Sequence, residues 1–119
     1  MKLIIAGGVA MRLSDEDLAK LDAIHAEHRI TEVVSGGARG VDADGESWAG
    51  SRGLPVRVFP ADWRRYGRGA GPVRNRQMAA YATAAVLFPG GSGTRNMLAE
   101  ARRAGLVVFD FMSDGPHHR

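Results

Sequence analysis

Hydrophobic residues form short continuous runs along the chain, and amphipathic stretches lie between these runs. The runs cover residues 2–6, 30–34, 56–59, 84–88 and 106–109. Each run has the length of a buried strand. Apolar positions recur at helical spacing over about 15–28, 41–52, 72–82 and 93–104. Buried strands that alternate with helices predict an α/β domain with a five-stranded parallel sheet.

Glycine turns follow three of the predicted strands. They are Gly7-Gly8, residues 35–42 and residues 89–94. Right-handed crossovers place these turns at the carboxyl ends of the strands, where ligands bind in open α/β sheets. Glycine lets the backbone approach a ligand, and the first N–H groups of the next helix have no carbonyl partner, which suits a phosphate. For one isolated turn of this kind, plain connection chemistry is an equal alternative.

The three turns define the candidate ligand-binding residues. These are Gly7, Gly8, Ser35, Gly36, Gly37, Arg39, Gly40, Asp42, Gly90, Gly91, Ser92, Gly93 and Thr94, with Arg74 and Asn75 from the helix that begins at Pro72. The Gly7-Gly8 pair does not continue as G-x-G-x-x-G, so NAD is not expected. Asp42 would hydrogen-bond a ribose hydroxyl or position a water, although acids in a first helical turn are also routine. Arg74 near a helix start is unfavourable unless an anion is bound there.

Arginines gather between residues 62 and 76, although the net charge of the chain is only +3. The cluster comprises Arg64, Arg65, Arg68, Arg74 and Arg76. It would attract the phosphates of a nucleotide or nucleic acid, and a solvated arginine face is the equal alternative. Trp63 amid these arginines would stack a base, but large aromatic residues are mostly buried, so Trp63 is expected to cap the core. Residues 60–71 show no periodicity and are expected to form a loop.

The 119 residues fit one domain, predicted over 1–110, with a loose tail over 111–119. A hydrophobic content of 45% with 24% charged residues is that of an ordinary globular protein. Without cysteine, the chain has neither disulfides nor thiolate metal sites, and His25 and His28 lack a nearby third ligand. No metal and no cofactor are therefore expected. The first apolar run is too short for a signal peptide or membrane span, so we expect a cytoplasmic protein without a membrane partner.

Four segments in order carry a family resemblance. They read VSGGARGVD at 34–42, FPADW at 59–63, GPVRNR at 71–76 and FPGGSGT at 88–94. Together they resemble the SLOG superfamily of Rossmann-like domains, which is named for the DNA-processing protein Smf/DprA and the LOG enzymes, and in particular its small YspA-like branch. The resemblance spans about residues 2–109. It implies a Rossmann-like three-layer sandwich that binds a nucleotide or nucleotide-derived ligand at the glycine turns, and it allows a homodimer.

The LOG enzymes are phosphoribohydrolases that release a base from a nucleoside monophosphate, and their motif reads P-G-G-x-G-T-x-x-E. In this chain Met97 stands where that glutamate is expected, and Glu100 lies one helical turn further on. A thioether carries no proton and stabilises no cationic centre. If N-glycosidic cleavage occurs, Asp42 would be the catalytic carboxylate and Arg74 would hold the phosphate.

Three functions follow from these observations. The first is a nucleotide-binding module that senses or processes its ligand, and it is favoured by the paired glycine turns and the small net charge. The second is a nucleotide hydrolase of the LOG kind, which the methionine at position 97 disfavours. The third is binding of single-stranded nucleic acid, as in the DprA relatives, through the arginine cluster and Trp63.

Overall fold

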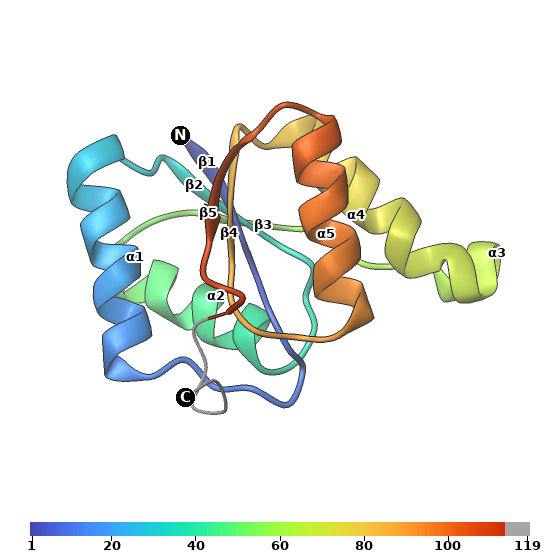
Figure 1. The fold of residues 1–119 in the computed structure, drawn as a ribbon, viewed down its shortest axis with the longest axis horizontal. Helices are drawn as coiled ribbons and strands as arrows, with labels where there is room; N and C mark the ends of the chain where they lie inside the picture. Colours follow the sequence, from blue (N-terminus) through green and yellow to red (C-terminus); the bar gives the residue numbers. More distant parts are fainter. Residues whose placement is uncertain (114–119) are drawn as a thin grey trace.

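The computed structural model describes residues 1–113. Its five strands are β1 (Lys2–Ala6), β2 (Glu32–Ser35), β3 (Val56–Val58), β4 (Ala84–Leu87) and β5 (Val107–Asp110). All neighbouring strands pair in parallel, in the order β3-β2-β1-β4-β5 (Figure 1). The helices are α1 (Asp15–His28), α2 (Val41–Ser51), α3 (Trp63–Tyr66), α4 (Ala70–Tyr81) and α5 (Ser92–Arg103), with a short 3₁₀ turn, η1 (Gly67–Gly69).

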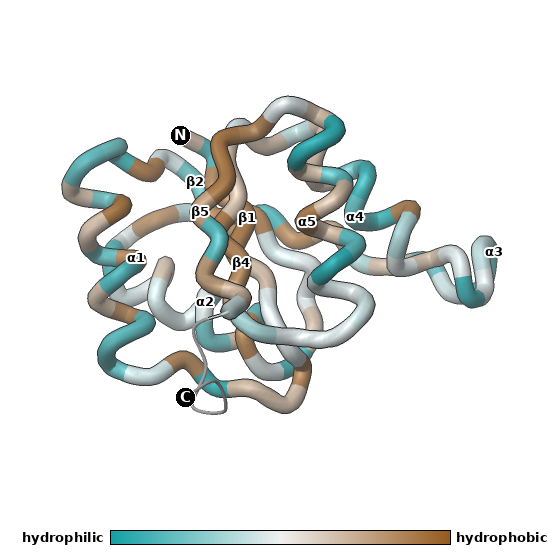
Figure 2. Tube along the Cα trace, viewed as in Figure 1, coloured by the Kyte–Doolittle hydropathy of each residue, from teal (hydrophilic) through white to brown (hydrophobic). Residues whose placement is uncertain are grey.

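The sheet lies between two layers of helices. Alternate residues of β1 point to opposite faces, so that Leu3 and Ile5 join the core beneath α1 and α2, while Ile4 and Ala6 join the core beneath α4 and α5. The most hydrophobic part of the chain runs along the central strands, whereas hydrophilic and hydrophobic residues alternate along the helices α1, α4 and α5 (Figure 2). The predicted α/β three-layer sandwich with a five-stranded parallel sheet is therefore confirmed.

The strand order creates one switch point, between β1 and β4. The chain builds outward from β1 through β2 to β3, then returns to the other side of β1 to form β4 and β5. The connections that leave β1 and β4 therefore run to opposite faces of the sheet. Such a divergence opens a crevice at the carboxyl ends of the strands.

The segment between β3 and β4 differs from the predicted loop. It contains α3 and η1, and α4 begins at Ala70, two residues before Pro72. A local cap explains the short helix, because the side chain of Asp62 accepts a hydrogen bond from the Arg65 N–H at 3.1 Å. This segment projects away from the sheet beyond α4 (Figure 1). Trp63 is 62% exposed there, so the prediction that it caps the core is wrong.

Phe111, where the tail is predicted to begin, still packs on the fold. Its N–H donates to the Leu87 carbonyl at 2.8 Å, and its ring lies 5.9 Å from that of Phe88. The rest of the predicted tail, from residue 114, lies outside the described residues.

The histidine pair of α1 has no further metal ligand beside it among the described residues. The His25 Nδ1 accepts the Ile30 N–H at 3.0 Å, and residues 1–113 hold no group of three metal-ligating side chains. None of the helices within this range is long and apolar enough to span a membrane.

Candidate functional site

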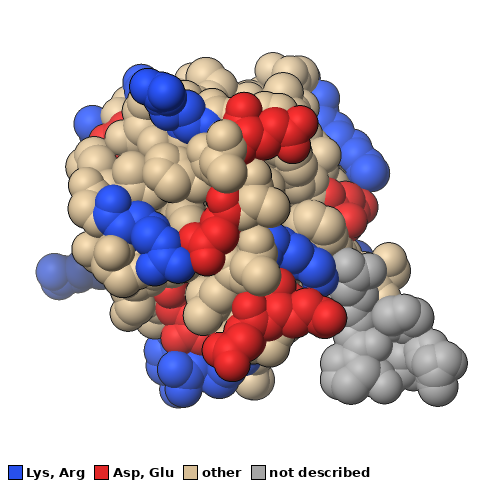
Figure 3. All heavy atoms as spheres, turned by 90° about the vertical axis from the view of Figure 1, so that its left-hand side faces the viewer, with Lys and Arg blue, Asp and Glu red and all other residues tan. Residues whose placement is uncertain are grey.

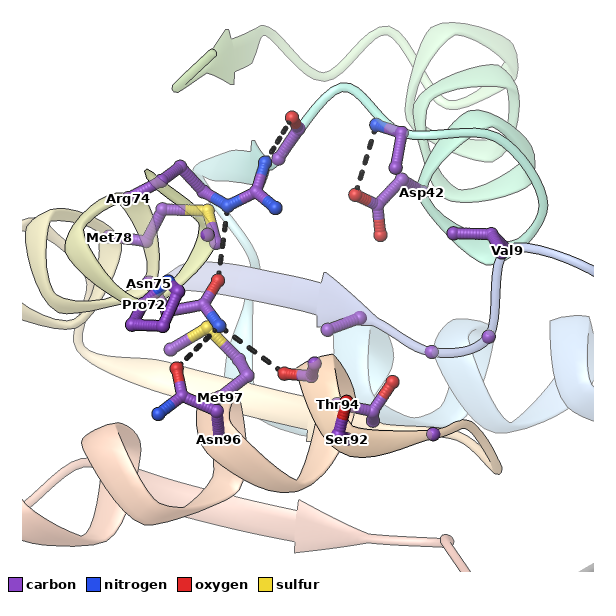
Figure 4. Close-up of a pocket in the computed structure, with 18 of the residues that line it drawn as sticks. Val9, Asp42, Pro72, Arg74, Asn75, Met78, Ser92, Thr94, Asn96 and Met97 are labelled. Atoms are coloured by element: carbon purple, nitrogen blue, oxygen red, sulfur yellow. Dashed lines mark hydrogen bonds between the residues drawn. The ribbon is translucent and has the colours of Figure 1, made fainter. Parts of the chain in front are cut away.

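An open cleft of about 640 Å³ lies at the carboxyl ends of β1, β2 and β4. Its walls come from the end of β1, the loop after β2 and the first turns of α4 and α5 (Figure 4). The volume falls within the usual range of small-molecule sites. The cleft therefore occupies the switch point that the strand order defines.

Main-chain hydrogen bonds join the three glycine turns behind the cleft. The Gly8 N–H donates to the Pro89 carbonyl at 2.9 Å, and the Gly8 carbonyl accepts the Val41 N–H at 3.2 Å. Gly40 has a φ of +72°, and a Cβ atom there would collide with the Gly8 carbonyl oxygen. A Cβ atom at Gly90 would collide with the Thr94 hydroxyl and the Gly8 nitrogen. These glycines allow the turns to pack against one another.

The α5 helix begins at the cleft without a side-chain cap. Its N-cap residue is Gly91, whereas α1 begins with a capping box in which Ser14 and Asp17 bond each other's backbone N–H. The first main-chain hydrogen bond of the helix runs from the Arg95 N–H to the Gly91 carbonyl, at 3.1 Å. The N–H groups of residues 92–94 precede it and have no carbonyl partner within the helix. Residues 91–94 line the cleft, so free donors at the positive end of the helix face it.

Arg74 and Asn75 connect the walls of the cleft. Arg74 Nη1 donates to the Gly36 carbonyl at 2.6 Å, and its Nε donates to Asn75 Oδ1 at 3.1 Å. Asn75 Nδ2 in turn donates to Asn96 Oδ1 at 2.8 Å and to the Gly93 carbonyl at 3.3 Å (Figure 4). Asn75 is buried. The Arg74 guanidinium is thus held in place by two hydrogen bonds, and no partner for its Nη2 is seen within residues 1–113.

Asp42 lies across the cleft from Arg74 (Figure 4). Among the described residues that line the cleft it is the one carboxylate, and it is 8% exposed. Its Oδ2 accepts the Ala38 N–H at 3.2 Å. Burial raises the pKa of Asp42 above its ordinary value of 3.8, although the Ala38 N–H and the charge of Arg74 act in the lowering direction.

The raised pKa of Asp42 predicts a pH-dependent cost to stability. Between pH 3.8 and the higher pKa of the folded state, the folded chain keeps a proton that the unfolded chain has released. The free energy of unfolding should therefore fall as the pH rises through this window. The asparagine of Asp42→Asn does not titrate. As the pH rises through this window, the free energy of unfolding of the variant, measured with urea, should therefore increase relative to that of the wild type. A stability difference that stays constant with pH would contradict this prediction.

The cleft collects ten of the predicted site residues. These are Gly7, Gly8, Gly36, Asp42, Arg74, Asn75, Gly91, Ser92, Gly93 and Thr94. Five others do not line it, namely Ser35, Gly37, Arg39, Gly40 and Gly90. Ser35 is buried, donates to Glu46 Oε2 at 2.6 Å and accepts the Gly37 N–H at 3.1 Å. Ser35 therefore stabilises the turn from behind the cleft.

The structure adds Arg68 and Asn96 to the lining of the cleft. Arg68 belongs to the arginine cluster, but the sequence does not distinguish it from Arg76, whose side chain is 66% exposed and lies outside the lining. The contact between Asn96 and Asn75 depends on how α4 packs against α5, and no sequence pattern marks it.

Met97 lines the cleft and is 1% exposed. Glu100 does not line the cleft. Its carboxylate lies instead 3.8 Å from Arg76 and 3.7 Å from Arg103. The acid one turn further on therefore does not replace the glutamate of the LOG motif. Among the described residues, Asp42 is therefore the one carboxylate that could act on a ligand in this cleft.

Comparison with known proteins places this geometry in a family. The sequence model of the YspA, cpYpsA-related SLOG family matches residues 1–66. The Gene 61 protein of Mycobacterium phage D29 is 40% identical, over 78% of this chain and 81% of its own. The X-ray structure of DNA processing protein A (DprA) from Streptococcus pneumoniae matches 98% of this chain with a TM-score of 0.73 and 18% identity. The chain spans about half of that protein, 54% of its length.

These matches agree with the arrangement of the strands and turns. The family match includes the first two glycine turns, and the structural match covers almost the whole fold. The chain therefore belongs to the YspA, cpYpsA-related SLOG family.

Proposed function

We propose that the cleft binds a nucleotide or nucleotide-derived ligand by its phosphate. The observation that carries this proposal is that the uncapped start of α5 and the fixed guanidinium of Arg74 face the same cleft. Both favour an anion, the first through free N–H donors and the helix dipole, the second through its charge. Membership of the SLOG family and the likeness to DprA support a role with nucleotides or nucleic acids in general.

Asp42 gives the cleft a second kind of recognition. A carboxylate that is 8% exposed and faces the cleft suits the hydroxyl groups of a ribose, which donate hydrogen bonds to it. We place binding ahead of hydrolysis, because Met97 stands where the LOG enzymes have their glutamate and Glu100 is turned to two arginines. The favoured function is therefore that of a sensing or processing module for nucleotides.

A thermal-shift panel tests the proposal. Each nucleoside monophosphate is compared with its nucleoside and with inorganic phosphate at equal concentration and moderate salt. A ligand at about 100 times its Kd stabilises the folded state by about 2.7 kcal/mol, which raises the Tm of a domain of this size by roughly 10 °C. We expect this shift from at least one monophosphate and not from its nucleoside. If no nucleotide shifts the Tm, the proposal is wrong.

A second candidate function, binding of single-stranded nucleic acid, is favoured by the projecting segment around α3. Trp63 is 62% exposed there, and the exposed residues Arg64, Arg65 and Arg68 follow it in the same segment. On the α1 side of the molecule, by contrast, acidic and basic side chains are interspersed (Figure 3). An exposed aromatic ring amid arginines stacks a base while the cations contact the backbone.

This candidate is distinguished from the first by its salt dependence. Each phosphate contact releases a counterion, so the affinity for a single strand should fall steeply as salt rises. Fluorescence anisotropy of a labelled oligothymidylate at two salt concentrations measures the slope, with Trp63→Ala as the variant. An affinity that salt leaves unchanged would exclude this function.

A further inference from the structure

A second, smaller cavity of about 420 Å³ adjoins the cleft. Arg74 belongs to the lining of both. The second cavity is walled by the loop after β3, by α3 and by the first half of α4. The segment that projects beyond the sheet contributes Arg68 to the cleft and Arg65 and Tyr66 to the second cavity.

The two cavities differ in their backbone donors and not in their charged side chains. Among the described residues, each is lined by one carboxylate and two arginines, which are Asp42, Arg68 and Arg74 in the cleft and Asp62, Arg65 and Arg74 in the second cavity. The cleft has, in addition, the free N–H groups at the start of α5, which favour a phosphate. A ligand that occupies both would therefore place its phosphate in the cleft at Arg74 and an uncharged part in the second cavity.

The lining of the second cavity suits a flat, polar, uncharged group. Tyr66 is 37% exposed, and the Arg65 guanidinium lies 5.2 Å from the centroid of its ring. Gln77 is exposed and brings an amide that both donates and accepts hydrogen bonds. An aromatic ring for stacking beside an amide for edge contacts is what a nucleobase requires.

We infer that the ligand is a dinucleotide unit, in which a phosphate joins two nucleosides. The first nucleotide occupies the cleft, the joining phosphate lies at Arg74, and the base of the second nucleoside enters the cavity beside Tyr66 and Gln77. This inference rests on the proposed function, because it takes the cleft as the site of the first nucleotide. It adds that a mononucleotide fills only part of the site.

Isothermal titration of the full chain tests the inference with matched ligands. Each of the four nucleoside 5′-monophosphates is compared with its homodinucleoside monophosphate, in which the one phosphate also carries a second nucleoside. We expect the dinucleotide of the preferred base to bind about tenfold more tightly, the gain from one stacked base. Gln77→Ala and Tyr66→Ala should remove this gain and leave the affinity for the monophosphate unchanged. Both side chains are exposed, so neither substitution opens a cavity in the core.

Neighbouring arginines provide the control for charge. Arg65 lines the second cavity and Arg64, the preceding residue, lines neither cavity among those described. Arg65→Ala should reduce the tenfold gain, and Arg64→Ala should preserve it. A hexanucleotide then tests whether the ligand is a free dinucleotide or a segment of a longer strand. If the ligand is a strand, the hexanucleotide binds more tightly than the dinucleotide, and if the ligand is a free dinucleotide, it does not. Both probes contain the proposed unit.

Two results would overturn the inference in different ways. If monophosphates bind but no dinucleotide binds more tightly, the second cavity takes no base and the proposed function stands. If neither class binds, the proposed function fails together with the inference.

Discussion

Arg74→Ala is expected to weaken nucleotide binding by about tenfold to a hundredfold. A hydrogen bond to a charged group contributes about 1.5–3 kcal/mol, and 1.4 kcal/mol is tenfold in affinity. The guanidinium is held by the Gly36 carbonyl and Asn75, so a phosphate meets a cation that is already in position. Isothermal titration with the monophosphate that gives the largest thermal shift measures the loss.

Arg76→Ala is the matched control for this substitution. It removes the same charge from the same helix, two residues away, but its side chain is 66% exposed and does not line the cleft. We expect the affinity of this variant to stay within about twofold of the wild type, as for an exposed charge screened by salt. Equal losses from both substitutions would show that binding follows the net charge of the arginine cluster and not the geometry of the cleft.

Gly91→Asp is expected to abolish nucleotide binding while the fold is retained. Aspartate is a preferred N-cap, and its carboxylate would accept hydrogen bonds from the free N–H groups at the start of α5. A Cβ atom at Gly91 meets open space, and its φ of −95° lies outside the left-handed region that favours glycine. At 4 Å and an effective dielectric constant of 20, a carboxylate repels a phosphate by about 4 kcal/mol, so a loss of at least about a hundredfold is expected.

Gly91→Asn separates competition for the donors from repulsion. Asparagine caps the helix equally well without a charge. Its affinity for the nucleotide should lie between those of the wild type and Gly91→Asp, and urea unfolding should show that all three proteins are folded. Unchanged binding in Gly91→Asp would mean that the ligand phosphate does not lie at the start of α5.

The strands and four of the helices could be predicted because burial and helical periodicity leave a direct trace in the order of apolar residues. The helix α3 left no such trace. It has four residues, none of them buried, and the Asp62 cap stabilises it locally. Periodicity requires a buried face, and α3 has none. Large aromatic residues are mostly buried, and this tendency alone places Trp63 in the core. Its exposure becomes evident only when the path of the chain beyond α4 is known.

The glycine turns indicated where the site lies but not which glycines face the cleft. In the sequence Gly90 and Gly91 are equivalent neighbours. In the structure a Cβ atom at Gly90 would collide with Thr94, whereas at Gly91 it would meet open space. A glycine is needed equally for close packing of turns and for close approach of a ligand, so the residue type alone does not separate the two roles. Contacts between segments far apart in the sequence decide between them.

The main-chain bonds that join Gly8 to Pro89 and Val41 have a consequence for how the cleft would meet its ligand. The rear wall of the cleft is held together by main-chain hydrogen bonds. The cleft is therefore preorganised, and little of the binding free energy is lost in ordering loops when a ligand arrives. Variation can therefore fall on a side chain of this wall that takes no part in these bonds, such as Val9, which lines the cleft and is 57% exposed.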